Sequence, residues 1–226
     1  MVGIPNEYFI EGLELEVKNQ VDEAINKIKS LGLKIKQISL PHTKYALSVY
    51  YIIMPAEVSS NLARFDGIRY GKVNGVLRGV HNLAELYKKN RSLGFGSESK
   101  RRIILGTFVL SSGYYDAYYT KAQKVRALIK QDFDEAFKSV DIILTPVTPT
   151  TAFKFGEKTN DPLAMYLSDI FTIPANMAGL PAISIPVRST MSPVANRLSL
   201  PVGFQLIGKH FHENDILGLG QLYERI

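Results

Sequence analysis

Apolar residues follow two different periods along residues 2–40. Val2–Pro5 and Leu33–Leu40 are short stretches typical of strands. Between them, apolar residues recur at steps of three and four, at Ile10, Leu13, Val17, Val21, Ala24, Ile28 and Leu31. This spacing places them on one face of a helix, and Gly32 follows where a left-handed C-terminal cap is favoured. The pattern predicts a β-α-β unit with parallel strands, whose helix covers one face of a sheet.

Further helical and extended stretches follow along the rest of the chain. We expect helices at residues 43–62, 82–90, 98–111, 114–139 and 162–173 and from Glu213, and strands at 141–144, 182–186 and 202–207. Because Pro55 lies inside an apolar run, we expect a kink there or two shorter helices. Residues 64–79 are rich in glycine and predict an irregular segment, and residues 188–200 predict a surface hairpin or loop. The pattern predicts an α/β fold with a mixed, largely parallel sheet flanked by helices.

Composition is that of an ordinary globular protein. Of the 226 residues, 46% are hydrophobic and 21% are charged, and the chain is long enough to bury one sizeable core. The longest apolar runs, such as Val49–Met54, are far shorter than the ~20 residues that span a bilayer. The absence of a leader pattern argues against secretion, and the absence of cysteine excludes disulfides, thiolate nucleophiles and cysteine-ligated metals. We therefore expect a cytoplasmic protein that does not contact a membrane.

The chain carries a moderate positive charge. There are 27 Lys and Arg residues against 21 Asp and Glu, which gives a net charge of +6. The densest clusters are small, at Lys34 and Lys36, at 88–91 and at 100–102. Such spread-out charge is more typical of solvated helix faces than of a nucleic-acid interface. The sequence therefore favours no direct binding of RNA or DNA by this chain.

Common catalytic motifs are missing from the sequence. It contains no G-x-S-x-G, no phosphate-binding G-x-x-x-x-G-K-[ST] and no H-E-x-x-H. The four histidines lack metal-ligand spacing, so we expect no metal site. The serine pairs 59–60 and 111–112 have no base placed near them by the sequence, which favours helix and turn roles. Taken alone, these patterns indicate only a cytoplasmic α/β protein.

Several longer blocks are more specific. Residues 59–71 are Ser-Ser-Asn-Leu-Ala-Arg-Phe-Asp-Gly-Ile-Arg-Tyr-Gly, and residues 110–119 are Leu-Ser-Ser-Gly-Tyr-Tyr-Asp-Ala-Tyr-Tyr. Other blocks are 94–102, 121–126, 161–166, 169–172, 178–184 and 200–208. Together, and in this order, they resemble the amidase-signature family, and within it the group formed by the A subunits of glutamyl-tRNA(Gln) amidotransferases. The tyrosine-rich block and Arg64–Gly67 indicate this group, since amidases at large do not share them.

The chain departs from the family where catalysis is concerned. The resemblance implies a nucleophilic serine, a bridging serine and a general-base lysine in the amino-terminal half of family members, within a glycine- and serine-rich signature. No block of this chain matches that signature, and Gly3–Pro5 resembles the strand that follows it. We therefore expect the carboxy-terminal portion of a single amidase-signature domain that contains no catalytic residue, and the sequence places no internal boundary in it. An expressed fragment, a split gene or a partial chain would each give this pattern.

The resemblance also implies a substrate and three residues that bind it. Free glutamine is a zwitterion, and in the family an arginine that matches Arg102 binds its α-carboxylate. The planar guanidinium of arginine suits a bidentate hydrogen bond to a carboxylate. Asp169 matches the aspartate that meets the α-ammonium group, and Tyr50 matches a tyrosine that lines the pocket. Adjacent Tyr51 is an alternative for the last role. From the pattern alone, Arg102 and Asp169 are helix-surface residues and Tyr50 packs in the core.

The resemblance further implies an assembly. In the family, glutamine is hydrolysed through an acyl-enzyme, and the released ammonia passes to the B subunit. The B subunit uses ATP and magnesium to amidate glutamate on tRNA, and the C subunit supports the complex of the other two. This chain is then expected to bind no cofactor itself and to meet tRNA only through the complex. The alternatives are a general amidase fragment, which the pairing of Arg102 with Asp169 disfavours, and a non-catalytic assembly module that binds the B or C subunits. Asp116 and Arg126 are expected to be structural ion-pair or interface residues.

Overall fold

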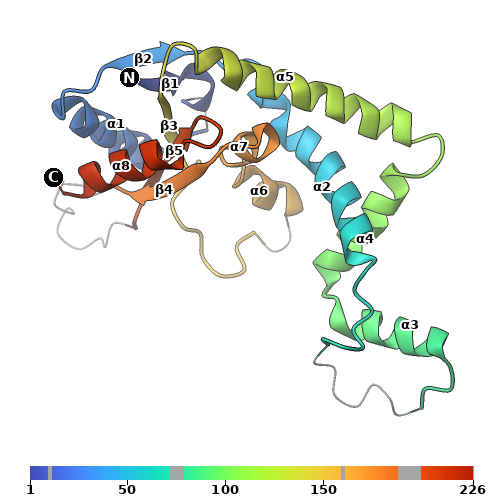
Figure 1. The fold of residues 1–226 in the computed structure, drawn as a ribbon. Coiled ribbons are helices and arrows are strands. Elements are labelled where there is room, and N and C mark those ends of the chain that lie inside the picture. Colours follow the sequence, from blue (N-terminus) through green and yellow to red (C-terminus); the bar gives the residue numbers. More distant parts are fainter. Residues whose placement is uncertain (10–11, 72–78, 159–160, 188–199, 226) are drawn as a thin grey trace. The chain divides into compact units, whose positions relative to one another are not determined.

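A computed structural model describes residues 1–9, 12–71, 79–158, 161–187 and 200–225 (Figure 1). The chain divides into two compact units, one made of Met1–Ser48 with Val125–Ile226 and the other of Val49–Lys124. Both boundaries fall inside helices, α2 (Ala46–Leu62) and α5 (Lys121–Ala136). Because continuous helices cross the boundaries, the units need not be independent domains, and the single-domain expectation stays a prediction.

The first unit is built on a five-stranded sheet with the order β2-β1-β3-β5-β4. Its strands are β1 (Val2–Pro5), β2 (Ile35–Ile38), β3 (Ile142–Pro146), β4 (Ala182–Pro186) and β5 (Gly203–Gly208). β1 pairs in parallel with β2 and β3, whereas β5 pairs antiparallel with β3 and β4. The predicted mixed sheet and the β-α-β unit are confirmed, with parallel pairing confined to the β2-β1-β3 side.

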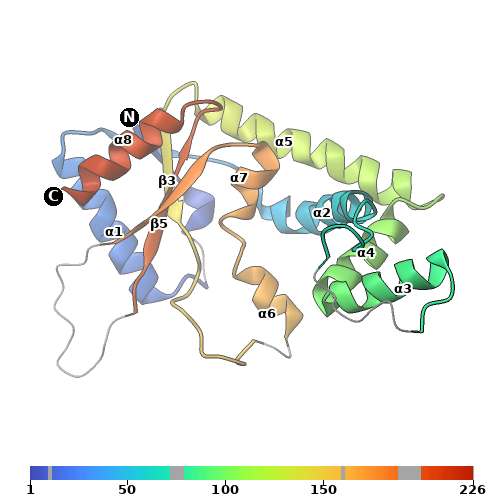
Figure 2. The same ribbon diagram turned by 60° about the horizontal axis from the view of Figure 1, so that its bottom comes forward.

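Two helices cover one face of this sheet. α1 (Leu15–Ser30) and α8 (Glu213–Glu224) pack there, as Figure 2 shows. The apolar stripe of α1 is buried against alternate residues of the strands, in a core that includes Val17, Val21, Ala24, Ile28, Ile4, Leu144, Phe204 and Leu206. Side chains alternate along a strand, so Gln205 and Ile207 face the opposite side. The predicted amphipathic helix therefore acts as the structural cover expected from its sequence.

The opposite face carries the segment that leads to the candidate site. There the helix expected at 162–173 ends early, as α6 (Pro162–Leu167), and a further helix that was not expected, α7 (Ile173–Ala178), follows. Asp161 caps α6 by accepting a hydrogen bond from the Ala164 N–H at 3.0 Å. Pro174 has no N–H to continue a helix from the preceding turn, so a new helix begins there. α7 ends at Gly179, whose φ of +72° forms the left-handed cap, and Arg126 donates to the Met177 carbonyl at 2.8 Å.

The second unit is helical. Besides most of α2 it contains α3 (Leu83–Gly94), α4 (Ser97–Val109) and a π-helix at Tyr115–Thr120 that leads into α5. α2 runs as one helix through Pro55, so of the two expected alternatives the pair of shorter helices is wrong, and a kink at Pro55 stays a prediction. Ile53 and Ala56 are buried beside Pro55, and packing here outweighs the lost backbone bond. Residues 64–71 form neither helix nor strand, in agreement with the predicted irregular segment.

Short one-turn elements complete the fold. Residues Asn6–Tyr8 and Thr43–Tyr45 form 3-10 turns, the second leading directly into α2. Gly32 follows α1 with a φ of +83°, as its position after the apolar stripe predicted. Residues 188–199, for which a hairpin or loop is predicted, lie outside the described part of the chain.

Candidate functional site

Arg102 lies on α4 and is held by an acidic residue one turn earlier. Its Nε donates to Glu98 Oε1 at 2.8 Å, and Nη1 reaches Met54 Sδ at 3.7 Å. The same carboxylate also accepts a hydrogen bond from Arg101 Nε at 2.9 Å. The Arg102 side chain is 33% exposed. Glu98 thus orients the guanidinium from one side, Met54 contacts Nη1, and among the described residues Nη2 has no hydrogen-bond partner.

The charges around Arg102 reinforce its protonated state. Partial burial acts against the charge, but the hydrogen bond to Glu98 and the nearby Tyr50 phenol raise the pKa of Arg102 above its ordinary value. The pKa of Glu98 is lowered, first by its hydrogen bond to Arg101 and then by that to Arg102, against the opposing effect of burial. At neutral pH this cluster is an ionised carboxylate between two guanidinium groups, with net positive charge.

Tyr50 and Tyr51 both lie near this cluster. Their rings meet edge to face with centroids 5.1 Å apart, and both side chains are half-buried on α2. Both phenols contribute to the raised pKa of Arg102, Tyr50 more strongly. The structure therefore places Tyr50 and Tyr51 within electrostatic reach of Arg102, and the assignment of Tyr50 and Arg102 to substrate stays a prediction.

Asp169 belongs to the other compact unit. It lies in the turn between α6 and α7, where its backbone N–H donates to the Tyr166 carbonyl at 3.1 Å and its carbonyl accepts from the N–H groups of Thr172 and Ile173, both at 3.1 Å. The side chain is exposed, and within the described residues its carboxylate has no hydrogen bond or ion pair. Such a carboxylate is available to an ammonium group.

A buried glutamine anchors the chain next to Asp169. The Gln205 side chain, 3% exposed on β5, donates from Nε2 to the Phe171 carbonyl and to Thr145 Oγ1, both at 2.7 Å. A hollow of about 340 Å³ adjoins this network and is lined in part by Thr172, Ser184 and Gln205. Gln205 therefore ties the segment after Asp169 to the sheet.

Sequence reasoning missed both supporting residues. Glu98 lies four residues before Arg102 on a predicted helix, a spacing at which acidic and basic side chains pair. Gln205 is a polar residue within an apolar strand, and such a residue needs a buried partner. Both signals are visible in the sequence, although neither identifies the partner of Gln205, which lies far away along the chain.

Other candidate residues have structural roles. Ser59 Oγ and Ser60 Oγ donate to the Ala56 carbonyl, and Ser111 Oγ donates to that of Phe108, as helix and turn serines do. Among the described residues, no group of three His, Asp or Glu side chains could hold a metal ion. In the same part of the chain, no helix has the length and apolar character needed to cross a membrane.

Comparison with known proteins identifies the family. A sequence profile described as Amidase matches residues 1–217. The chain belongs to the amidase family. The crystal structure of an amidase superimposes with a TM-score of 0.70 at 20% identity, covering 99% of this chain and 45% of that one, which shows a shared fold.

Within the family, the similarity is to the A subunit of glutamyl-tRNA(Gln) amidotransferase. The chain is 56% identical over 224 residues to that protein from Syntrophus aciditrophicus, and 55% identical to that from Carboxydothermus hydrogenoformans. Both alignments cover 99% of this chain and 44% of the relative. The crystal structure of the Thermotoga maritima A subunit has a TM-score of 0.66 and 41% identity, covering 95% of this chain and 40% of that one. The chain thus spans less than half the length of these relatives.

Proposed function

We propose that this chain is the glutamine-binding portion of the glutaminase subunit of a glutamyl-tRNA(Gln) amidotransferase. The observation that carries the proposal is the identity of more than half of all residues to the A subunit over 99% of the chain. The family resemblance assigns Arg102, Tyr50 and Asp169 to glutamine. Two of the three, Arg102 and Tyr50, lie in one neighbourhood.

Each residue has chemistry suited to its proposed role. The Arg102 guanidinium binds the α-carboxylate through N–H groups that Glu98 does not use, and Glu98 keeps the side chain in place. The exposed Asp169 carboxylate binds the α-ammonium group. Tyr50 lines the pocket for the aliphatic part of the substrate. Gln205 acts indirectly, by holding the backbone that follows Asp169.

The chemical step belongs to the portion of the glutaminase that this chain does not match. In this proposal, the nucleophilic serine, the bridging serine and the general-base lysine lie there, so this chain positions substrate and breaks no bond. The ammonia released from glutamine serves the B subunit, which binds ATP and magnesium and amidates glutamate on tRNA, and the C subunit supports the assembly. The complex works in the cytoplasm.

A glutaminase assay tests the proposal directly. The chain alone should release no ammonia from glutamine above the uncatalysed rate, because an unactivated hydroxyl is a poor nucleophile. Coexpression with the amino-terminal portion of a close relative's A subunit, together with the B and C subunits of that relative, should restore activity. Ammonia release by the chain alone, abolished by a substitution in it, would contradict the assignment of catalysis to the amino-terminal portion.

Substrate preference separates this proposal from a general amidase. A plain amide has no α-carboxylate or α-ammonium group, so Arg102 and Asp169 would have nothing to bind. The restored enzyme should therefore prefer glutamine to simple amides such as butanamide by a large factor in kcat/KM, and the preference should shrink when Arg102 is replaced. Equal rates on both substrates would favour the amidase alternative.

A further inference from the structure

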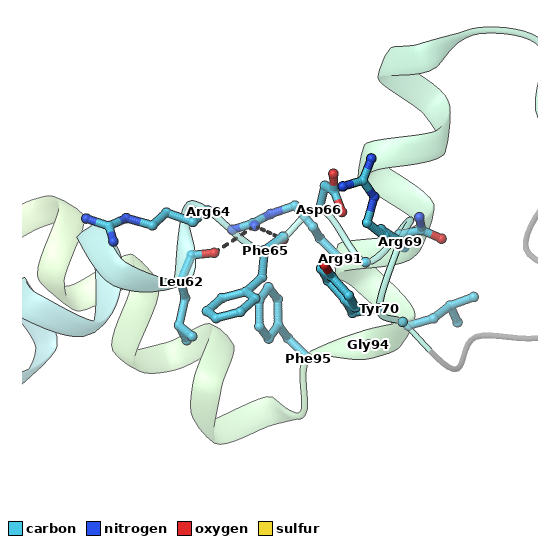
Figure 3. Close-up of a pocket in the computed structure, with 13 residues that line it drawn as sticks. Leu62, Arg64, Phe65, Asp66, Arg69, Tyr70, Arg91, Gly94 and Phe95 are labelled. Atoms are coloured by element: carbon cyan, nitrogen blue, oxygen red, sulfur yellow. Dashed lines mark hydrogen bonds between the residues drawn. The ribbon is translucent and has the colours of Figure 1, made fainter.

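The second unit holds a cavity apart from the residues assigned to glutamine. It has a volume of about 890 Å³ and lies between the end of α2, residues 64–71 and the last turns of α3 (Figure 3). Its size is in the range of pockets that bind ligands or anchoring side chains. Most of its lining comes from residues 62–71, and the rest comes from the last turns of α3 and Phe95.

Arg91 holds the walls of this cavity together. Its Nη1 donates to the carbonyls of Leu62 at 3.0 Å and Phe65 at 2.8 Å, and its guanidinium lies 5.0 Å from the Phe95 ring centroid. The segment beyond Phe65 is tightly turned: a side chain at Gly71 would approach the Gly67 carbonyl oxygen within 2.2 Å. The cavity is therefore shaped by specific contacts of the loop with α3.

Large side chains remain exposed around this cavity. Tyr70 is 90% exposed, Phe65 60% and Leu93 61%, although leaving such groups in water is unfavourable. In Figure 3, Arg64 and Arg69 extend on either side of the aromatic rings. Both arginines are exposed, and within the described residues neither guanidinium has a hydrogen bond or ion pair. Exposed cations next to exposed aromatic rings give this surface both positive charge and apolar area.

The composition of the lining favours a protein partner. It includes three arginines and one aspartate but no lysine. Aromatic residues and arginine are enriched at the centres of protein interfaces, whereas lysine is depleted there. The aliphatic side chains of Leu62 and Leu93 complete an apolar wall, which suits an inserted apolar side chain better than a base with polar edges.

We propose that this cavity docks an acidic segment of a partner protein. An apolar side chain of that segment enters between Phe65, Tyr70 and Phe95, and flanking carboxylates pair with Arg64 and Arg69. Charge complementarity supports this choice, since the chain as a whole carries +6 and the lining has an excess of two positive charges. The inference does not depend on glutamine binding, so a negative glutaminase assay would leave it standing.

Selection from a random twelve-residue peptide library tests the inference on the intact chain. Peptides retained by the wild-type chain, and not by the double variant Arg64→Ala/Arg69→Ala, should be rich in Asp and Glu and carry an aromatic or aliphatic residue. The strongest such peptide should bind the double variant about tenfold more weakly or worse, given the usual strength of charged hydrogen bonds. Tyr70→Ser should also weaken it. These substitutions remove side chains with no described polar partner, so the fold should persist.

A matched control uses two exposed lysines of the first unit, Lys29 on α1 and Lys154. Lys29→Ala/Lys154→Ala removes the same charge from that unit and should leave peptide affinity within about twofold. The inference would be overturned if the retained peptides showed no enrichment in Asp and Glu. It would also be overturned if both double variants lowered peptide affinity equally. Preferential binding of a twelve-nucleotide single-stranded RNA, lost in Arg64→Ala/Arg69→Ala, would instead assign the cavity to nucleic acid.

Discussion

Arg102 is the residue on which the proposed glutamine site depends most. In the restored enzyme, Arg102→Ala should raise the KM for glutamine and lower kcat/KM tens- to hundreds-fold, since a hydrogen bond to a charged group contributes ~1.5–3 kcal/mol. Arg102→Lys should retain part of the wild-type kcat/KM, because lysine keeps the positive charge but cannot form a bidentate hydrogen bond to the carboxylate. Arg101→Ala is the control, since Arg101 bonds the same Glu98 yet is assigned no substrate contact. An unchanged KM for glutamine in Arg102→Ala would contradict the substrate contact and indicate that Arg102 is only a helix-surface residue.

Glu98 should make the stability of the chain depend on pH. Its pKa in the folded chain is lowered from 4.5, so its ion pairs stabilise the fold fully above that value and are lost as the pH falls through the lowered pKa. The difference in unfolding free energy between the wild-type chain and Glu98→Gln should therefore be present at neutral pH and vanish in acid. Chemical denaturation across a pH series measures it. Because the pair is partly exposed, about 1 M salt should shrink the difference, and a difference independent of pH would contradict the ion pairing.

Among the elements, α2 and α4 make an unusually close contact at Gly106. A side chain at Gly106 would lie 1.8 Å from the Pro55 carbonyl oxygen, so Gly106→Ala must push the helices apart. The expected loss of stability is on the order of 1–3 kcal/mol or more, as for other overpacked sites. Thermal or chemical unfolding measures it.

A second helical glycine gives a matched control for that contact. Nothing lies within 4 Å of a side chain added at Gly218 on α8, so Gly218→Ala should stabilise the chain by about 1 kcal/mol through helix propensity. Equal effects of the two substitutions would show that the α2–α4 contact is not close in solution.

At the scale of the whole molecule, the two edges of the sheet differ. β2 carries Lys36 at one edge, whereas β4 at the other edge is Ala-Ile-Ser-Ile-Pro without any charge, and Ala182 and Ser184 are exposed. Charge on an edge strand opposes pairing between chains, and an uncharged edge invites it. The chain made alone should therefore oligomerise or aggregate through β4.

Sedimentation velocity at several concentrations tests this association. Ala182→Lys should shift the chain towards monomer. Asn19→Lys, which adds the same charge at an exposed position of α1, should not. A wild-type chain that stays monomeric and unfolds cooperatively would contradict the prediction, and would favour the assembly-module alternative to the proposed function.

Local features of the fold followed directly from residue patterns. The stripe from Val17 to Ile28 fixed the buried face of α1, Gly32 supplied its left-handed cap, and the bounds of β1 and β4 match those expected. These features depend on periodicity and backbone preference over neighbouring residues, which a sequence displays. The family blocks likewise pointed to the amidotransferase group by themselves, because each is a run of adjacent residues.

Other features required the folded chain, since they join residues that are distant in sequence. Antiparallel pairing of β5 with β3 and the three-way bonding of Gln205 depend on which strands become neighbours. α2 stays one helix through Pro55 because packing compensates for a lost backbone hydrogen bond. Local helix propensity takes no account of this packing, so the sequence pattern did not predict it. The cavity held by Arg91 arises in the same way: its hydrogen bonds reach from α3 back to Leu62 and Phe65, so its shape exists only once the loop has closed.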